Sequence, residues 1–206
     1  GSLKTLRQYY TESDYTESPP GPISVVVGDG TVEKNYLQEC KQLYEMNSDL
    51  IGWIAIPNTG INYPVMQTGT DRRNYYLTRD FNKNETGYGC IYASEDCDVF
   101  TPSDNVTLYG HHMADGSMFA QLDKYKSQEF WEKNQFFTFD TLYEHRKYQI
   151  IAVFKINASS DFRYHMYSNF ISEADFNEFI STIKKMSFYE TGLTAEYGDK
   201  IVCLST

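Results

Sequence analysis

The chain has 206 residues, 41% of them hydrophobic, which is enough apolar material for one well-packed domain. Its formal net charge is −10 and no basic stripe runs through it, which argues against nucleic acid or an anionic membrane surface as a partner. No apolar run approaches the roughly 20 residues of a membrane-spanning helix, and an aromatic content of 16% favours a β-rich fold.

The first part of the chain is polar. Residues 1–31 are rich in Ser, Thr, Pro and Gly, with S-P-P-G-P at 18–22, and Gly1-Ser2 is typical of a cloning scar. This composition predicts a flexible lead or tether. We therefore expect a single folded domain over 32–206.

A helix is predicted over 33–46, because its apolar residues share one helical face. Those residues are Tyr36, Leu37, Cys40, Leu43 and Tyr44.

Short apolar runs bounded by turn residues dominate the rest of the chain, and they predict strands. A helix is expected at 127–134, and another begins after Ser172, which suits an N-cap, with Asp175 where a capping box carries its acid. Many short strands with few helices indicate a mainly β fold, a closed or nearly closed barrel decorated by helices. The predicted strands are 50–57, 61–67, 89–94, 105–110, 135–140, 147–156 and 200–206.

The stretch V-T-L-Y-G-H-H-M-A-D-G-S-M-F-A-Q-L at 106–122 is the most informative for chemistry. A strand ends at Tyr109, Gly110 permits a sharp departure of the backbone, and His111 follows. A histidine at a rigid strand end is well positioned for acid–base work, although most such histidines are ordinary surface residues. His112 points in a different direction, so at most one of the two rings faces a given site.

Four cysteines, Cys40, Cys90, Cys97 and Cys203, form no C-x-x-C pair, and no zinc-ligand spacing accompanies the histidines. Cys203 lies in the apolar run I-V-C-L-S-T at the end of the chain. A cysteine needs a cationic neighbour to become a nucleophilic thiolate. The run by itself indicates a core residue.

The chain resembles the class B sortases, cell-surface cysteine transpeptidases of Gram-positive bacteria, from about Asn35 to Thr206. The resemblance rests on D-L-I-G-W-I-A-I-P-N-T-G-I-N-Y-P-V-M-Q, N-Y-Y-L at 74–77, Y-G-H-H-M-A-D-G-S-M-F-A-Q-L and the final L-S-T. It implies a sortase-type closed barrel with an N-terminal helix and a helix before the penultimate strand. It also implies no cofactor and no metal.

The resemblance assigns residues by motif position. The histidine after the glycine is catalytic, which is His111. The nucleophilic cysteine directly follows the threonine of the last motif, here Thr206, so that cysteine and the arginine of the next strand are expected beyond this chain. The positions expected to line the substrate groove are Asn74, Leu77, Tyr109, Tyr164, Ser205 and Thr206.

Each groove position keeps an alternative interpretation. Tyr109 is equally a core aromatic, and Tyr164 is equally a surface aromatic. Asn74, Leu77 and Ser205 also fit an exposed amide, a core leucine and a strand serine bonded to the backbone.

The resemblance implies cleavage at the threonine of a C-terminal N-P-x-T-x-like sorting motif of surface proteins. The acyl group then passes to an amine of a peptidoglycan precursor or cross-bridge. The expected location is the outer face of the plasma membrane or the cell wall, with an N-terminal transmembrane anchor outside this chain. Two other functions stay open, a catalytically silent sortase-like module that binds sorting peptides and a thiol enzyme that uses Cys203.

Overall fold

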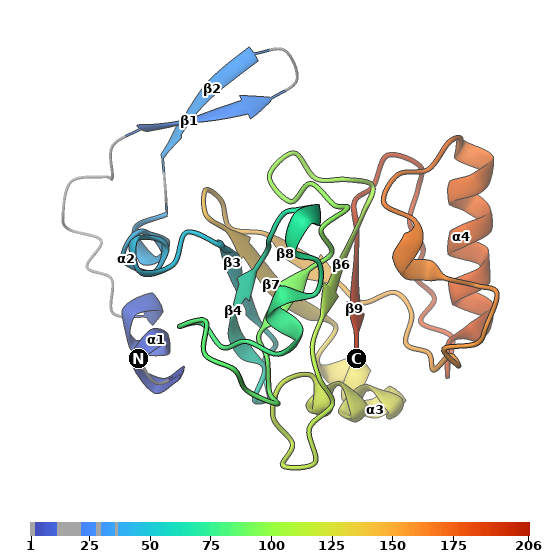
Figure 1. Cartoon of the computed structure of the whole chain (residues 1–206). Helices are drawn as coiled ribbons and strands as arrows, with labels where there is room; N and C mark the ends of the chain where they lie inside the picture. Colours follow the sequence, from blue (N-terminus) through green and yellow to red (C-terminus); the bar gives the residue numbers. More distant parts are fainter. Residues whose placement is uncertain (1–2, 12–21, 28–29, 36) are drawn as a thin grey trace.

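The computed structural model describes residues 3–11, 22–27, 30–35 and 37–206. Its centre is a seven-stranded sheet in the order β8-β7-β3-β4-β5-β6-β9, which curves into a nearly closed barrel (Figure 1). The pairs β4–β5 and β6–β9 are parallel, and the other neighbours are antiparallel. The strands are β3 (Leu50–Ala55), β4 (Asn62–Met66), β5 (Ile91–Ala93), β6 (Asn105–Tyr109), β7 (Phe136–Thr141), β8 (Lys147–Gln149) and β9 (Ile201–Ser205).

The main core fills the interior of this barrel. Alternate residues of each strand point inward, so that Val106 and Leu108 of β6 and Val202 and Leu204 of β9 belong to the same cluster. The opposite faces of β6 and β9 point out of the barrel. This alternation decides which side chains of the two strands can take part in a site outside the core.

Helices cover the outside of the barrel. Phe176, Phe179, Ile180 and Ile183 of α4 (Glu173–Met186) pack in one cluster with Ile201 and Cys203 of β9. On the other side, α2 (Gln38–Met46) packs Cys40 and Leu43 against Trp53 of β3. The other helical elements are α3 (Gln128–Lys133) and the 3-10 turns η1 (Thr70–Arg72), η2 (Tyr75–Leu77), η3 (Ala120–Lys126) and η4 (Tyr164–Met166).

The mainly β architecture and the two later helices agree with the predictions. The N-cap at Ser172 is confirmed, because its Oγ accepts a hydrogen bond from Asp175 N at 3.2 Å. Ser127 caps α3 in the same way by accepting from Phe130 N at 3.2 Å.

The predicted strand at 147–156 is wrong beyond Gln149. Residues 150–156 find backbone partners outside a strand ladder. Ile150 N donates to Gln135 O at 2.8 Å, and Phe188 N donates to Val153 O at 2.8 Å. The apolar pattern of this segment therefore records its packing against α4 and the core, where Phe154 and Val153 are partly buried, and not a strand.

The N-terminal region also differs from the prediction. Residues 3–11 form α1 (Leu3–Thr11), which packs on the barrel through buried Leu6 and through a stack of Tyr10 on Trp53 with ring centroids 4.5 Å apart. Residues 3–11 are therefore helical and not part of a flexible lead. Most of the S-P-P-G-P stretch at 18–22 lies outside the described residues. β1 (Pro22–Val27) and β2 (Gly30–Asn35) form a separate hairpin.

The helix predicted at 33–46 begins only at Gln38, because residues 33–35 belong to β2. Tyr36, which the prediction placed on the helix face, lies outside the described residues. Among the helices that the structure describes, none has the length and apolar character needed to cross a bilayer.

Candidate active site

Two parallel strands, β6 and β9, carry the candidate site at their C-terminal ends. Tyr109 pairs with Ser205, and Gly110 N donates to Ser205 O at 3.0 Å. The hydrogen bonding between the two strands therefore extends past the last residue of β6. His111 follows Gly110 directly. The imidazole is therefore placed by a rigid strand end next to the point where β9 ends.

His111 is oriented by a backbone carbonyl. Its Nε2 lies 2.7 Å from Leu77 O. A carbonyl oxygen only accepts hydrogen bonds, so Nε2 carries the proton. Nδ1 has no hydrogen-bond partner among the described residues and is the nitrogen available for chemistry.

His112 is held elsewhere. It is exposed, and its Nε2 lies 3.0 Å from Asp123 Oδ2. The two adjacent rings thus have different partners, as their positions in the sequence predict. Only His111 belongs to the candidate site.

A short turn supplies the carbonyl that holds His111. Asn74 has φ 56° and ψ 21°, in the left-handed region, and Leu77 N donates to Asn74 O at 3.0 Å to close η2. The Tyr92 hydroxyl donates to Asn74 Oδ1 at 3.1 Å, which leaves the Asn74 side-chain amino group pointing away from that bond. Leu77 is 38% exposed, so it is a surface residue and not the core leucine of the alternative interpretation.

A row of aromatic and hydroxyl side chains borders the outer face of β6 and β9. The ring of Tyr109 lies 5.3 Å from that of Tyr92 and 6.4 Å from that of His165. Tyr164 Oη lies 2.7 Å from Ser205 Oγ. Two residues that the sequence analysis proposed separately are therefore direct partners, and Thr206 follows them as an exposed residue.

The tyrosines of this row stay neutral at physiological pH. Burial raises the pKa of Tyr92 to about 12, with a further increase from the charge of Glu95. Burial also raises the pKa of Tyr109 and of Tyr164 above the ordinary value, and the Ser205 hydrogen bond partly opposes this for Tyr164. Their hydroxyls are therefore hydrogen-bond donors at the site.

Cys203 does not take part in this arrangement. It pairs with Thr107, four residues before His111, so the two side chains are separated by about 13 Å along the strand direction. It packs in the cluster under α4, and burial raises the pKa of its thiol to about 12. A buried thiol with a raised pKa is a poor nucleophile, which argues against an enzyme that uses Cys203.

Comparison with known proteins identifies the family to which this fold belongs. The family model described as "Sortase domain" matches residues 54–206. The chain belongs to the sortase family. Its curated relatives include the sortase B of Staphylococcus aureus, 30% identical over 166 residues, which are 81% of this chain and 66% of the relative. The chain thus spans about two thirds of the length of the curated relatives that it matches.

Solved structures agree with this membership. A Bacillus anthracis protein described as similar to sortase B superposes with a TM-score of 0.79 at 31% identity, covering 98% of this chain and 87% of that chain. A Staphylococcus aureus sortase B–substrate complex gives a TM-score of 0.82 at 25% identity, covering 99% and 86%. The class B sortase resemblance found in the sequence is therefore confirmed.

The sortase motifs did not reveal every residue of the site. Tyr92 and Glu95, which hold Asn74, and His165, which packs on Tyr109, were missed. Their contacts join segments far apart in the sequence. The only local signal was their polar or aromatic character, in or just after the short strand β5 and in the segment before α4.

One group of possible metal ligands exists among the described residues of this sortase. It consists of Glu39, Asp140 and His145, whose ligand atoms lie within 4.8 Å of one another. His145 already places Nδ1 2.9 Å from Asp140 Oδ2 and Nε2 3.1 Å from Glu39 Oε1. The group is built from α2 and the end of β7, so it does not belong to the His111 site.

Proposed function

We propose that the intact protein is a cysteine transpeptidase of the class B sortase type, in which His111 acts with a cysteine that directly follows Thr206. The observation that supports this most strongly is the parallel register of β6 and β9. If Tyr109 is level with Ser205, the residue after Thr206 is level with His111. Paired residues of neighbouring parallel strands, about 4.8 Å apart, direct their side chains to the same face.

The first half of the proposed reaction is acyl transfer to the enzyme. The thiolate attacks the carbonyl carbon of the motif threonine, and the tetrahedral intermediate collapses to a thioester as the amide C–N bond breaks. His111, with Nε2 held by Leu77 O, has Nδ1 free to stabilise the thiolate as imidazolium and then to protonate the leaving amine. The arginine of the next strand and backbone N–H groups would stabilise the oxyanion.

The second half resolves the thioester. An amine from a peptidoglycan precursor or cross-bridge attacks the thioester carbonyl, the C–S bond breaks, and the thiolate is regenerated. His111 accepts the proton of the attacking amine. The product is a surface protein joined to the cell wall, which places the protein at the outer face of the plasma membrane, with the N-terminal transmembrane anchor as part of the proposal.

The groove residues receive roles that follow from their contacts. The free amino group of the Asn74 side chain donates to a substrate carbonyl, and exposed Leu77 packs against the motif proline. Tyr109 forms the aromatic wall. The Tyr164–Ser205 pair and Thr206 border the motif threonine next to the scissile bond.

The test is cleavage of an internally quenched N-P-x-T-x peptide by the intact protein. We expect His111→Ala to lower kcat/KM by about a thousandfold, because both the thiolate stabilisation and the general acid are lost. His112→Ala is the matched control and should keep wild-type turnover, since its ring is bonded to Asp123.

Mass spectrometry of the intact protein with peptide and no amine should reveal a covalent acyl-enzyme. Near-normal turnover of His111→Ala contradicts the proposed mechanism. Peptide binding without cleavage by the wild-type protein would instead support a silent sorting-peptide module.

A further inference from the structure

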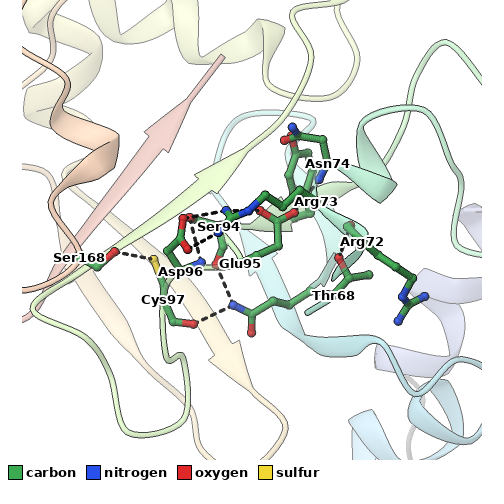
Figure 2. A network of polar contacts seen from close by, with 11 residues as sticks. Thr68, Arg72, Arg73, Asn74, Ser94, Glu95, Asp96, Cys97 and Ser168 are labelled. Carbon is green, nitrogen blue, oxygen red and sulfur yellow. Dashed lines mark hydrogen bonds and ion pairs between the residues drawn. The ribbon is translucent and has the colours of Figure 1, made fainter. Parts of the chain in front are cut away.

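Glu95 lies next to Asn74 in a polar network that joins two loops (Figure 2). Its side chain is only 6% exposed. One carboxylate oxygen, Oε1, accepts from Asn74 N at 2.8 Å, and the other, Oε2, lies 3.9 Å from Arg73 Nη1. The nearly buried Glu95 carboxylate therefore accepts a charge-assisted hydrogen bond from one backbone N–H at the edge of the site.

That backbone N–H belongs to a residue in the left-handed region, which asparagine adopts more readily than other non-glycine residues. Two contacts hold Asn74 there, the Glu95 bond to Asn74 N and the Tyr92 hydroxyl on Asn74 Oδ1. The first fixes the backbone, and the second fixes the direction of the side-chain amide.

The same turn reaches His111 at its other end. Leu77 N donates to Asn74 O at 3.0 Å, and Leu77 O accepts from the His111 ring at 2.7 Å. Cys90 N also donates to Tyr76 O at 2.9 Å, which ties the middle of the turn to the start of β5. A shift of Asn74 is thereby transmitted to the carbonyl that sets the tautomer of His111.

The neighbouring acid has a different role, which makes it a useful comparison. Asp96 accepts hydrogen bonds from the two terminal guanidinium nitrogens of Arg73, Nη1 at 2.8 Å and Nη2 at 2.6 Å. Its side chain is 55% exposed. Among the described residues it forms no hydrogen bond or ion pair with Asn74 or His111, and Figure 2 shows it on the far side of Arg73 from the turn. Glu95 is thus the member of the acidic pair that holds the turn.

We propose that Glu95 is a positioning residue. It holds the Asn74–Leu77 turn so that the Leu77 carbonyl keeps the His111 ring in the Nε2–H tautomer and the Asn74 amide faces the substrate. The structural part concerns this chain alone. Its catalytic consequence rests on the proposed function.

The structural part is tested by 15N NMR of the imidazole ring of His111 at a pH where the ring is neutral. The wild-type chain should show the Nε2–H tautomer alone. Glu95→Ala should shift the ring toward the mixture of tautomers of an unconstrained imidazole, and Glu95→Asp should do the same, because a side chain one methylene shorter no longer reaches Asn74 N. Glu95→Gln should keep the single tautomer, since its amide oxygen accepts the same hydrogen bond. Asp96→Asn is the matched control and should leave the tautomer unchanged.

A ring wholly in the Nε2–H tautomer in Glu95→Asp overturns the proposal, as does a mixture of tautomers in Asp96→Asn. The amide spectrum of each variant separates a local change from unfolding. If Glu95→Ala unfolds, Glu95→Asp, which keeps the charge beside Arg73, decides the question.

The catalytic part is tested on the intact protein with the quenched peptide. Glu95→Asp should lower kcat/KM by about 10- to 100-fold, the scale expected when a reacting group is displaced by about 1 Å. The pH profile of kcat should shift in this variant, whereas a purely structural residue would change only the unfolding midpoint. Glu95→Gln should restore most of the activity.

Unchanged kinetics and pH profile in Glu95→Asp contradict the positioning role. Failure of the proposed function would be seen differently, as turnover that survives His111→Ala, and the NMR result would still stand on its own.

Discussion

Two glycines allow the contact between His111 and the Leu77 carbonyl. Gly89 has φ +61°, and a Cβ there would lie 2.5 Å from Leu77 O. Gly110 sits over the core, and a Cβ there would lie 2.4 Å from Ile91 Cδ1 and 2.8 Å from Phe119 Cδ2. Both positions bring backbone closer to its neighbours than any side chain allows.

Gly110→Ala tests this close approach. Ile91 and Phe119 are fully buried, so the added methyl overpacks the core, and we expect a loss of about 1 to 3 kcal/mol in the free energy of unfolding. His111 is the next residue, so peptide cleavage by the intact protein should fall as well. Urea unfolding and the quenched-peptide assay measure the two effects.

Gly87→Ala is the matched control, because no atom lies within 4 Å of its added Cβ. It should leave both stability and cleavage near wild type. A Gly110→Ala variant with wild-type stability would mean that the core has room for the methyl group.

Among single residues, the sequence predicted those that occupy a recognisable motif position or lie in a segment expected to border the groove. His111 follows the glycine of a specific stretch, and Ser205 and Tyr164 were proposed independently before the structure brought their hydroxyls to 2.7 Å. Glu95 could not be predicted, because its role is a hydrogen bond to a backbone N–H 21 positions earlier in the sequence. An acidic residue in an acidic chain carries no local sign of such a partner.

At the scale of elements, one histidine joins α2 to the end of β7. His145 bonds Asp140 through Nδ1 and Glu39 through Nε2, and both carboxylates are buried. The hydroxyl of Tyr10, on α1, donates to the same Asp140 carboxylate. The helices α1 and α2, which cover one side of the barrel, are thus connected to strand β7 by a single polar cluster.

His145→Ala should destabilise the fold by about 1 to 3 kcal/mol, because two buried carboxylates lose a polar partner. Urea unfolding at neutral pH measures this. His112→Ala is a control of the same residue type, and it should cost less than about 1 kcal/mol because its partner Asp123 is exposed. Equal effects of the two substitutions would show that the His145 cluster contributes nothing beyond a surface ion pair.

The elements also show where prediction from sequence fails. Leu3, Leu6 and Tyr10 recur at helical spacing, but the Ser- and Pro-rich composition of the region obscured the helix. The apolar run at 147–156 predicted a longer strand than β8, because packing against α4 needs the same residue types as a strand. Apolar patterns in the sequence predict which residues are buried. They do not predict the hydrogen-bond partners of the backbone, which come from distant parts of the chain.

At the scale of the whole molecule, the net charge of −10 includes carboxylates that stabilise the fold only when ionised. Burial raises the pKa of Asp49, but hydrogen bonds from Arg72 and Tyr76 and the charge of Lys83 outweigh it, and the pKa is lowered overall. The pKa of Asp104 is lowered mainly by the backbone N–H of Phe170, with Lys200 also contributing.

A carboxyl group whose pKa is lower in the folded chain stabilises the fold above its unfolded pKa of about 3.9, and this stabilisation is lost as the pH falls through the folded value. We therefore expect the free energy of unfolding to be level from pH 7 to about pH 5 and to fall between about pH 4 and pH 2. Urea titrations at several pH values measure the slope. Asp49→Asn should make it shallower, and an unchanged slope would rule out a contribution from Asp49.

The pairing of β6 with β9 has a consequence for how the protein is made. The two strands are separated by about 100 residues of chain, and contacts of such long range form late in folding. During synthesis the histidine leaves the ribosome long before the strand that completes its surroundings. If the proposed function holds, a growing polypeptide is therefore inert toward peptides, its own segments included, until almost all of the domain has been translated.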